Sequence, residues 1–286
     1  MTPAQPFDPI TFKEAQRTDW EIAARGWRKW YDVLEGGGQI VSRTLVELAG
    51  IGPSDTVLDV ATGYGEPALT AARIVAPTGR VLAADISANM LDFGRERAAR
   101  AGLDNVEFLE ADTEALSFES DTFDAILSRQ GLQFLPDVPG TLERFHTFLK
   151  RDGRLAAAVW GAPETVQFAR PVSVILEALD LPAPPASGPG IFALADPDAL
   201  VRLVTDAGFR DVETGTVMAV YETPSPEDFT QWARDVAPPI VNLLKGQSPE
   251  TKEQVWRKVT AAWAPFTTAD GRVRTENQAV WVAATK

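Results

Sequence analysis

The chain contains no cysteine and only one histidine, His146, among its 286 residues. The first absence excludes disulfides, thiolate zinc sites and cysteine nucleophiles, and the second excludes a metal site built from several histidines. Positive charge is also scarce, because 27 Lys and Arg stand against 40 Asp and Glu, for a net charge of -13. A nucleic-acid surface needs clustered Lys and Arg, so we expect no nucleic-acid partner.

Long apolar runs are missing as well, since none approaches the ~20 residues of a membrane-spanning helix. Residues 1–12 lack the basic and apolar regions of a signal peptide. We therefore expect no membrane span and a cytoplasmic location. The length and the 45% hydrophobic content suit one large α/β domain, or one domain with a smaller cap.

Strand and helix patterns alternate through the middle of the chain. Apolar strands are expected over 56–60, 80–84, 105–109, 123–128 and 154–160, with helices over 66–76, 87–101 and 138–149 between them. This rhythm predicts a doubly wound α/β fold, with a mostly parallel sheet covered on both faces. Two helices precede it, over 13–35 and 39–50, and the run Gly36-Gly37-Gly38 is expected to break the chain between them.

Beyond Trp160 the rhythm loosens. We expect helices over 164–180 and 196–207, a Pro-rich loop from Pro182 to Pro189, and long strands over 211–222 and 278–285. Two or three helices rich in Trp and Pro fill residues 226–264 between these strands. The pattern indicates an N-terminal helical arm (1–38), a core (39–223 and 277–286) and a helical insertion (224–276).

The most informative segment runs from Val57 to Ala68. An apolar strand there ends in Asp59, a turn containing Gly63 and Gly65 follows, and Pro67 opens a helix. Such a turn lets the backbone approach a nucleotide-like ligand closely, at the strand ends where open α/β sheets bind their ligands. The later strand ends carry polar residues too: Asp85, then Asp112, then Ser128 and Arg129.

These strand ends suit adenosine joined to a cationic amino acid. Asp85 lies 20 residues beyond Gly65, where a carboxylate can accept both hydrogen bonds of a ribose diol. Ile86 can lie against a purine face, and Asp112 can accept from an adenine amino group. Asp59 lies where a ligand ammonium can dock.

A dinucleotide is the rival ligand. Gly63, Gly65 and Ala68 match G-x-G-x-x-A, with Asp85 at the expected distance. Against it, Asp59 places negative charge near a pyrophosphate, and Pro67 removes a backbone N–H that would help to hold phosphate. An NAD-dependent oxidoreductase therefore remains an alternative, as does a non-catalytic adenosyl-ligand-binding protein.

The run from Asp59 to Gly65 resembles the D-x-G-x-G-x-G motif of class I S-adenosylmethionine-dependent methyltransferases, with Ala61 replacing the first glycine. The chain is most similar to the ubiquinone/menaquinone-biosynthesis type of small-molecule methyltransferase. The family's later motifs match at Ala83–Leu91, Glu110–Glu114, Phe123–Arg129 and Leu149–Gly153, where a proline and a glycine are missing. The resemblance covers about residues 40–160.

The resemblance implies seven strands in the order 3-2-1-4-5-7-6, with strand 7 antiparallel. It implies S-adenosyl-L-methionine as the cofactor, S-adenosyl-L-homocysteine as the product, and in-line transfer of a methyl group to carbon or oxygen of a small, aromatic or hydrophobic acceptor. The insertion would cap that acceptor, and the arm would close over the cofactor. No catalytic base and no metal ligand is assigned. The expected cofactor-binding residues are Trp30, Tyr31, Asp59, Ala61, Gly63, Gly65, Asp85, Ile86, Met90, Asp112, Thr113, Ser128 and Arg129.

Other conspicuous side chains have simpler explanations. His146 lies off the apolar stripe of its helix, so we expect a solvated side chain rather than a general base. Core packing is the default for several aromatic residues and one arginine that could also line an acceptor pocket: Trp160, Phe168, Arg170, Phe192, Tyr221 and Trp232. The identity of the acceptor and the oligomeric state, a homodimer included, stay open.

Overall fold

The computed structural model describes residues 7–182 and 188–286, so most of the expected loop from Pro182 to Pro189 lies outside the described residues. A seven-stranded sheet has the order β3-β2-β1-β4-β5-β7-β6, as the resemblance implies. The parallel strands are β1 (Thr56–Val60), β2 (Arg80–Asp85), β3 (Val106–Glu110), β4 (Phe123–Arg129) and β5 (Leu149–Trp160). Strand β7 (Val273–Thr285) runs antiparallel to β5 and to β6 (Arg210–Thr223).

Helices cover both faces of the sheet because the buried strands are apolar on both sides. On one face, α2 (Tyr31–Leu48) and α3 (Ala68–Val75) pack against side chains such as Val57 and Leu127. On the other face, α5 (Val138–Phe148) and α7 (Pro197–Asp206) pack against Leu58 and Ile126. Neighbouring residues of β1 and β4 thus enter opposite cores, as the two-residue period of a strand requires.

Shorter elements complete the chain. Helix α4 (Ala88–Arg100) follows β2 and begins at Ser87, whose hydroxyl accepts from the backbone N–H of Met90 at 3.2 Å, as expected for an N-cap. Single turns are η1 (Thr113–Ala115), η2 (Leu132–Phe134), η3 (Pro163–Thr165), η4 (Gln167–Ala169) and η5 (Ala264–Phe266).

The insertion contains the helices α8 (Pro226–Val236), α9 (Pro238–Asn242) and α10 (Pro249–Ala261). Helices α9 and α10 form a small core together with α6 (Arg170–Ala178), whereas the buried side chains of α8 belong to the core on the α2 face of the sheet. Ile175 of α6 packs with Ile240, Val255 and Val259. Strand β7 already begins at Val273, so residues 273–276 belong to the sheet and not to the insertion.

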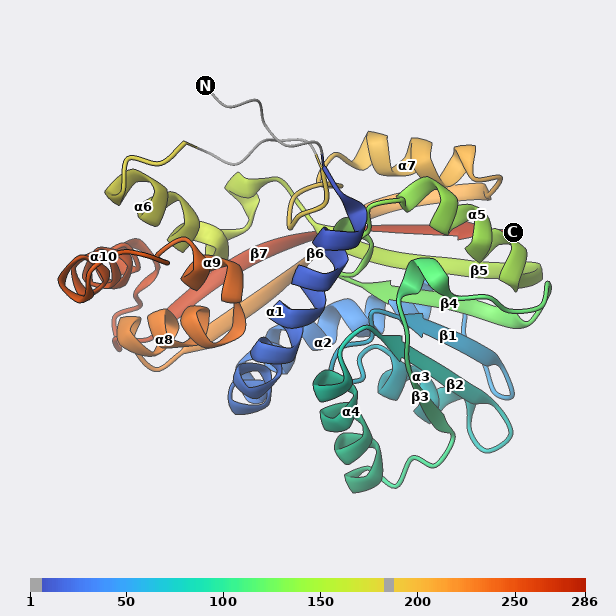
Figure 1. Ribbon diagram of the computed structural model, residues 1–286. Coiled ribbons are helices and arrows are strands. Elements are labelled where there is room, and N and C mark those ends of the chain that lie inside the picture. The colour runs from blue at the N-terminus through green and yellow to red at the C-terminus, as the bar shows by residue number, and fades with distance from the viewer. Residues whose placement is uncertain (1–6, 183–187) are drawn as a thin grey trace.

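Helix α1 (Pro9–Lys29) crosses the molecule in Figure 1 between α4 and the insertion helices, and it packs against α4, α8 and α9. Among the described residues, no helix is both long and apolar enough to span a membrane.

The predicted break at Gly36-Gly37-Gly38 is wrong. All three glycines lie inside α2, and the chain turns instead at Trp30, between α1 and α2. A Cβ on Gly37 would lie 2.4 Å from the carbonyl oxygen of Val220, and one on Gly38 would lie 2.8 Å from Nη1 of Arg129. These glycines let α2 approach β6 and the end of β4 closely, so they serve packing and do not end a helix.

Candidate functional site

The turn after β1 has an unusual backbone. Ala61, Gly63 and Gly65 all have positive φ angles, of 54°, 55° and 97°. A Cβ on Gly63 would meet nothing within 4 Å, so the space beside this residue is open. Gly63 is therefore needed for its conformation, and it leaves room for a ligand to approach the backbone.

Asp59, the penultimate residue of β1, has a fully buried carboxylate. Its Oδ2 accepts from the Thr62 hydroxyl at 2.5 Å and from the backbone N–H of Ala68 at 3.0 Å. Its Oδ1 has no hydrogen-bond partner among the described residues. Burial raises the pKa of Asp59 to about 7, even though both hydrogen bonds favour the ionised form. A cationic group beside Oδ1 would favour ionisation further.

Asp85 ends β2 and braces the glycine turn. Its Oδ2 accepts from the backbone N–H of Gly63 at 2.8 Å, and its Oδ1 accepts from that of Ser87 at 2.9 Å. Burial raises the pKa of Asp85 to about 6. A carboxylate accepts more than two hydrogen bonds, so both oxygens keep capacity for a ligand hydroxyl. Met90, one turn into α4, is buried against Ala23 and Ala24 of α1.

Asp112 and Ile86 lie in one cavity of about 280 Å³, together with Ile10, Lys13, Glu14 and Arg17 of α1. The structure thus brings together the residue expected against a purine face and the residue expected at the adenine amino group, and residues of α1 line the same cavity. Thr113, the next residue, is nearly buried. Lys13 donates to Oδ2 of Asp112 at 2.7 Å and also pairs with Glu114.

Arg129, at the end of β4, turns away from this cavity toward α2. Its guanidinium donates to the Ser42 hydroxyl at 2.8 Å and to the Tyr64 hydroxyl at 2.6 Å, and it lies 3.6 Å from the Glu35 carboxylate. Tyr64 in turn donates to Glu35 at 2.7 Å. Burial raises the pKa of Glu35 against the opposing effect of Arg129. The Tyr64 side chain therefore anchors the glycine turn to α2 and β4.

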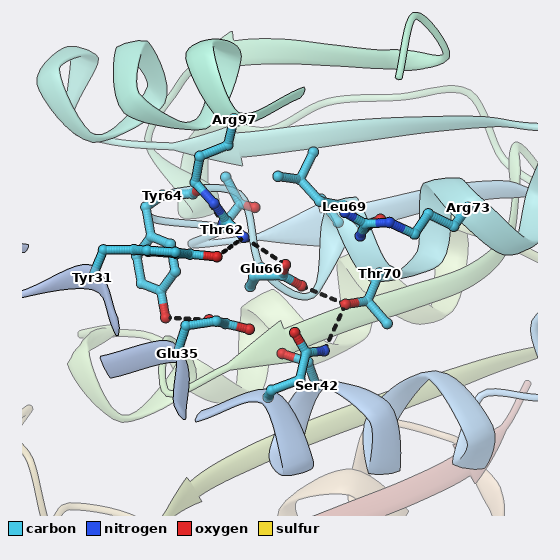
Figure 2. A network of polar contacts seen from close by, with 12 residues as sticks. Tyr31, Glu35, Ser42, Thr62, Tyr64, Glu66, Leu69, Thr70, Arg73 and Arg97 are labelled. Carbon is cyan, nitrogen blue, oxygen red and sulfur yellow. Dashed lines mark hydrogen bonds and ion pairs between the residues drawn. The ribbon is translucent and has the colours of Figure 1, made fainter. Parts of the chain in front are cut away.

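A second set of contacts holds the turn from the α4 side, as Figure 2 shows. Arg97 donates to the backbone carbonyl of Tyr64 at 2.8 Å, to Glu66 at 2.9 Å and to the Tyr31 hydroxyl at 3.0 Å. The second oxygen of Glu66 accepts from Thr70 at 2.6 Å. The turn is thus fixed on both sides before any ligand binds.

The two arm residues singled out from the sequence have distinct surroundings. Tyr31 packs edge-on against Tyr64 and Phe93, with ring centroids 6.0 and 5.7 Å apart. Trp30 donates from Nε1 to Asp235 of α8 at 2.8 Å. Direct contact of either residue, of Ser128 or of Arg129 with a cofactor stays a prediction.

Several residues of these contacts were not predicted from the sequence. Tyr64 could have been recognised, because a large side chain between two glycines of a turn has to pack behind that turn. Glu35, Glu66 and Arg97 could not, because their partners are distant in the chain or depend on how the helices pack.

The aromatic residues considered for an acceptor pocket pack mainly against one another. Phe168 lies 4.9 Å from Trp160, 5.7 Å from Tyr221 and 5.9 Å from Trp232, between ring centroids. Trp160, Tyr221 and Trp232 belong to the core that covers the α2 face of the sheet, as the default interpretation expects, and Phe168 and Phe192 pack against that core. Arg170 stacks over Phe266 at 5.8 Å.

His146 lies at the end of α5, away from the carboxyl ends of the parallel strands. Its ring packs edge-on against Phe209 with centroids 5.1 Å apart, and partial burial lowers its pKa. It is half-buried rather than solvated, and its position agrees with the expectation that it is no general base for this site.

The comparisons with known proteins agree with this geometry. Residues 57–153 match the family model of a methyltransferase domain. The ubiquinone/menaquinone biosynthesis C-methyltransferase of Ectopseudomonas mendocina is 32% identical over 211 residues, which are 68% of this chain and 82% of that protein. The enzyme of the same name from Escherichia coli is 31% identical over 203 residues, which are 64% of this chain and 79% of that protein.

Solved structures share the fold at lower identity. A methyltransferase-like protein of Bacillus halodurans is 21% identical, with a TM-score of 0.55 over 86% of this chain and 98% of that one. Phosphoethanolamine N-methyltransferase 2 of Haemonchus contortus, solved with S-adenosyl-L-methionine, is 19% identical. Its TM-score is 0.56, over 99% of this chain and 60% of that one.

Proposed function

The chain belongs to the class I S-adenosylmethionine-dependent methyltransferases, and from this premise we propose that it methylates carbon or oxygen of a small aromatic acceptor of the quinone type. Its cofactor is S-adenosyl-L-methionine, and its class of reaction is methyl transfer. The C-methyltransferase relatives support the choice of acceptor, because their names specify ubiquinone and menaquinone biosynthesis.

The residues at the carboxyl ends of β1, β2 and β3 fit the cofactor. The partnerless Oδ1 of Asp59 suits its ammonium, and Asp85 suits its ribose hydroxyls. The cavity beside Ile86 and Asp112 suits the adenine ring. We assign Met90 and Thr113, which follow these residues closely in the sequence, to the same site. The open space at Gly63, between Ala61 and Gly65, suits the methionine backbone. When bound, this cofactor supplies a methyl group that its positive charge has already activated for displacement.

The protein then has to orient the acceptor and exclude water. Tyr31 and Arg129 support cofactor binding indirectly, because they help to keep the glycine turn in place. Tyr31 does so through its contact with Arg97, and Arg129 through its contact with Tyr64. Trp30 ties the arm to α8 through Asp235. We assign the arm to closure over the cofactor, and the insertion helices α8, α9 and α10 to a cap over the acceptor.

One observation carries the choice of an aromatic acceptor. Trp20 of α1 lies edge-on to Phe134, just beyond β4, with ring centroids 5.6 Å apart, and edge-on to Trp27 at 5.7 Å. Trp27 donates from Nε1 to the carbonyl of Val236 in α8 at 2.9 Å. Flat apolar rings thus lie beside Phe134, just beyond the carboxyl end of β4, at the edge of the sheet where open α/β folds bind their ligands, and such rings can stack on the ring of an acceptor.

The test combines cofactor binding with turnover. Calorimetry is expected to show binding of S-adenosyl-L-methionine by the wild type and much weaker binding by Asp85→Ala. A screen of quinols, phenols and amines, read as release of S-adenosyl-L-homocysteine, is expected to show turnover with quinols or phenols. Turnover with amines alone would overturn the acceptor class, and binding without any turnover would favour a silent binding protein.

A further inference from the structure

Partnerless polar atoms cluster just beyond β4. Oγ of Ser128, both amide atoms of Gln130 and Nε2 of Gln133 are buried without a hydrogen-bond partner in the described parts of the chain. Buried polar groups are normally hydrogen-bonded, and leaving one unpaired is costly. Four such atoms within six consecutive residues mark a place where a ligand can supply the missing partners.

The backbone at Gln130 is strained in a way that supports a ligand site. Its φ is 63°, in the left-handed region that glutamine rarely adopts. Its N–H donates to the carbonyl of Ala158 in β5 at 2.8 Å, which helps to hold this conformation. Strained residues of this kind concentrate at functional sites, where the conformation aims a side chain.

Gln133 is fixed by hydrogen bonds of both its side chain and its backbone. Its Oε1 accepts from the backbone N–H of Trp160 at 3.2 Å, and its backbone carbonyl accepts from Gly190 at 2.9 Å. The residue is 1% exposed. Because Oε1 is already bonded, the amide orientation is defined and Nε2 remains as a fixed donor.

The segment that carries the two amides lies against the turn after β1. Gly131, between them, approaches Ala61 so closely that a Cβ there would lie 2.5 Å from the Ala61 Cβ. The Trp20 ring packs edge-on against Phe134, the residue after Gln133. Arg129, the charged neighbour of Gln130, is already engaged by Ser42, Tyr64 and Glu35. The polar groups left for a ligand here are therefore neutral.

We infer that Gln130 and Gln133, called the amide pair below, determine acceptor specificity by binding neutral oxygen substituents on the acceptor ring. Oε1 of Gln130 accepts from a hydroxyl, and the two Nε2 groups donate to hydroxyl or carbonyl oxygens. Carboxylate and ammonium groups find no countercharge in this pair. The inference rests on the proposed methyl transfer for the identity of the bound molecule as an acceptor.

The test compares naphthohydroquinone with naphthalene, binding to the protein loaded with S-adenosyl-L-homocysteine and measured by calorimetry. The wild type is expected to prefer the diol. Gln130→Met, which keeps the length of the side chain, is expected to weaken diol binding about 5–30-fold, as the loss of one buried hydrogen bond does. Naphthalene and S-adenosyl-L-homocysteine should bind as before, with Tm unchanged or raised, because an unpaired amide has been removed. Gln133→Glu keeps an acceptor for Trp160 and replaces the Nε2 donor with a carboxylate oxygen, so it should weaken the binding of naphthoquinone, whose carbonyl oxygens can only accept.

Equal diol affinity in the wild type and Gln130→Met would overturn the inference and leave the amides as sites for ordered water. The outcome for the proposed function is separate. If Gln130→Met turns over quinols with an unchanged KM, the role of the amide pair is refuted, whereas the proposed methylation of quinols stands. If Gln130→Met loses the preference for the diol but the wild type turns over no quinol or phenol, the amide pair binds the diol as inferred, whereas the proposed reaction is refuted.

Discussion

At the scale of single residues, the two buried carboxylates of the site carry its pH dependence. Burial raises the pKa of Asp59 to about 7 and that of Asp85 to about 6. Both values lie above those of an unfolded chain, so ionising these groups costs stability. Their contribution to folding is complete below pH ~4 and is lost as the pH rises through about 6 and then about 7. A ligand ammonium or hydroxyl that favours the ionised carboxylates offsets this loss of stability.

We therefore expect S-adenosyl-L-methionine to bind more tightly as the pH rises from 5.5 to 7.5, where its own amine is still largely protonated. In Asp59→Asn the part of this dependence centred near pH 7 should vanish, while the part near pH 6 that belongs to Asp85 remains. The ligand-free variant should also be more stable than the wild type at pH 8, by about 1–3 kcal/mol. Calorimetry across this pH range and urea denaturation measure the two effects. An Asp59→Asn profile identical to that of the wild type would contradict the assignment of Asp59 to the ammonium.

The residue types at positions 61 and 131 are explained by the contact between Ala61 and Gly131. Gly131 has ordinary helical angles, so it needs no glycine for its conformation, whereas Ala61 has a φ of 54° that glycine would adopt more easily. Gly131→Ala is expected to destabilise by about 1–3 kcal/mol, because the new Cβ would overlap Ala61. Adding Ala61→Gly should recover part of that loss in urea denaturation. Additive effects of the two substitutions would contradict direct contact between them.

At the scale of elements, the predictable features were those carried by local chemistry. The N-cap at Ser87 and the alternation of apolar strands with helices follow from neighbouring residues, and the resemblance supplied the strand order. The role of Gly37 and Gly38 could not be predicted, because the residues that they approach lie in β6 and at the end of β4, far along the chain. The amides of Gln130 and Gln133 were missed because a partnerless atom becomes visible only once the surroundings are known.

Gly36 and Gly37 of α2 should therefore respond differently to the same substitution. A Cβ on Gly36 would meet nothing within 4 Å, so Gly36→Ala is expected to stabilise by about 0.5–1 kcal/mol through helix propensity. Gly37→Ala would place its Cβ 2.4 Å from the carbonyl of Val220 and 2.5 Å from the Tyr221 ring, and it should destabilise. Thermal and urea denaturation compare the two. A destabilising Gly36→Ala would indicate that the helix is strained at this point.

At the scale of the whole molecule, α1 connects the two halves of the site. It packs against α4 beside the cofactor strands and against α8 and α9 of the insertion (Figure 1). Two ion pairs tie it to the strand ends, Lys13 with Asp112 and Arg17 with Glu110, both at 2.7 Å. The Lys13 ammonium thus donates to the same carboxylate that the adenine amino group is expected to use. We expect the two donors to compete for Asp112 when the cofactor binds.

Lys13→Gln is therefore expected to bind S-adenosyl-L-methionine about 2–5-fold more tightly than the wild type at low ionic strength, because it removes the partly exposed ion pair that competes for Asp112, together with the pair to Glu114. The difference should shrink at 1 M salt, because screening weakens the pair that competes. Arg17→Gln is the matched control, since it removes an ion pair from the same helix without touching Asp112, and its affinity should change less. Weaker binding by Lys13→Gln at every salt concentration would contradict this competition. Lys13 would then help to bind the adenine, and α1 would close the site without competing with the cofactor.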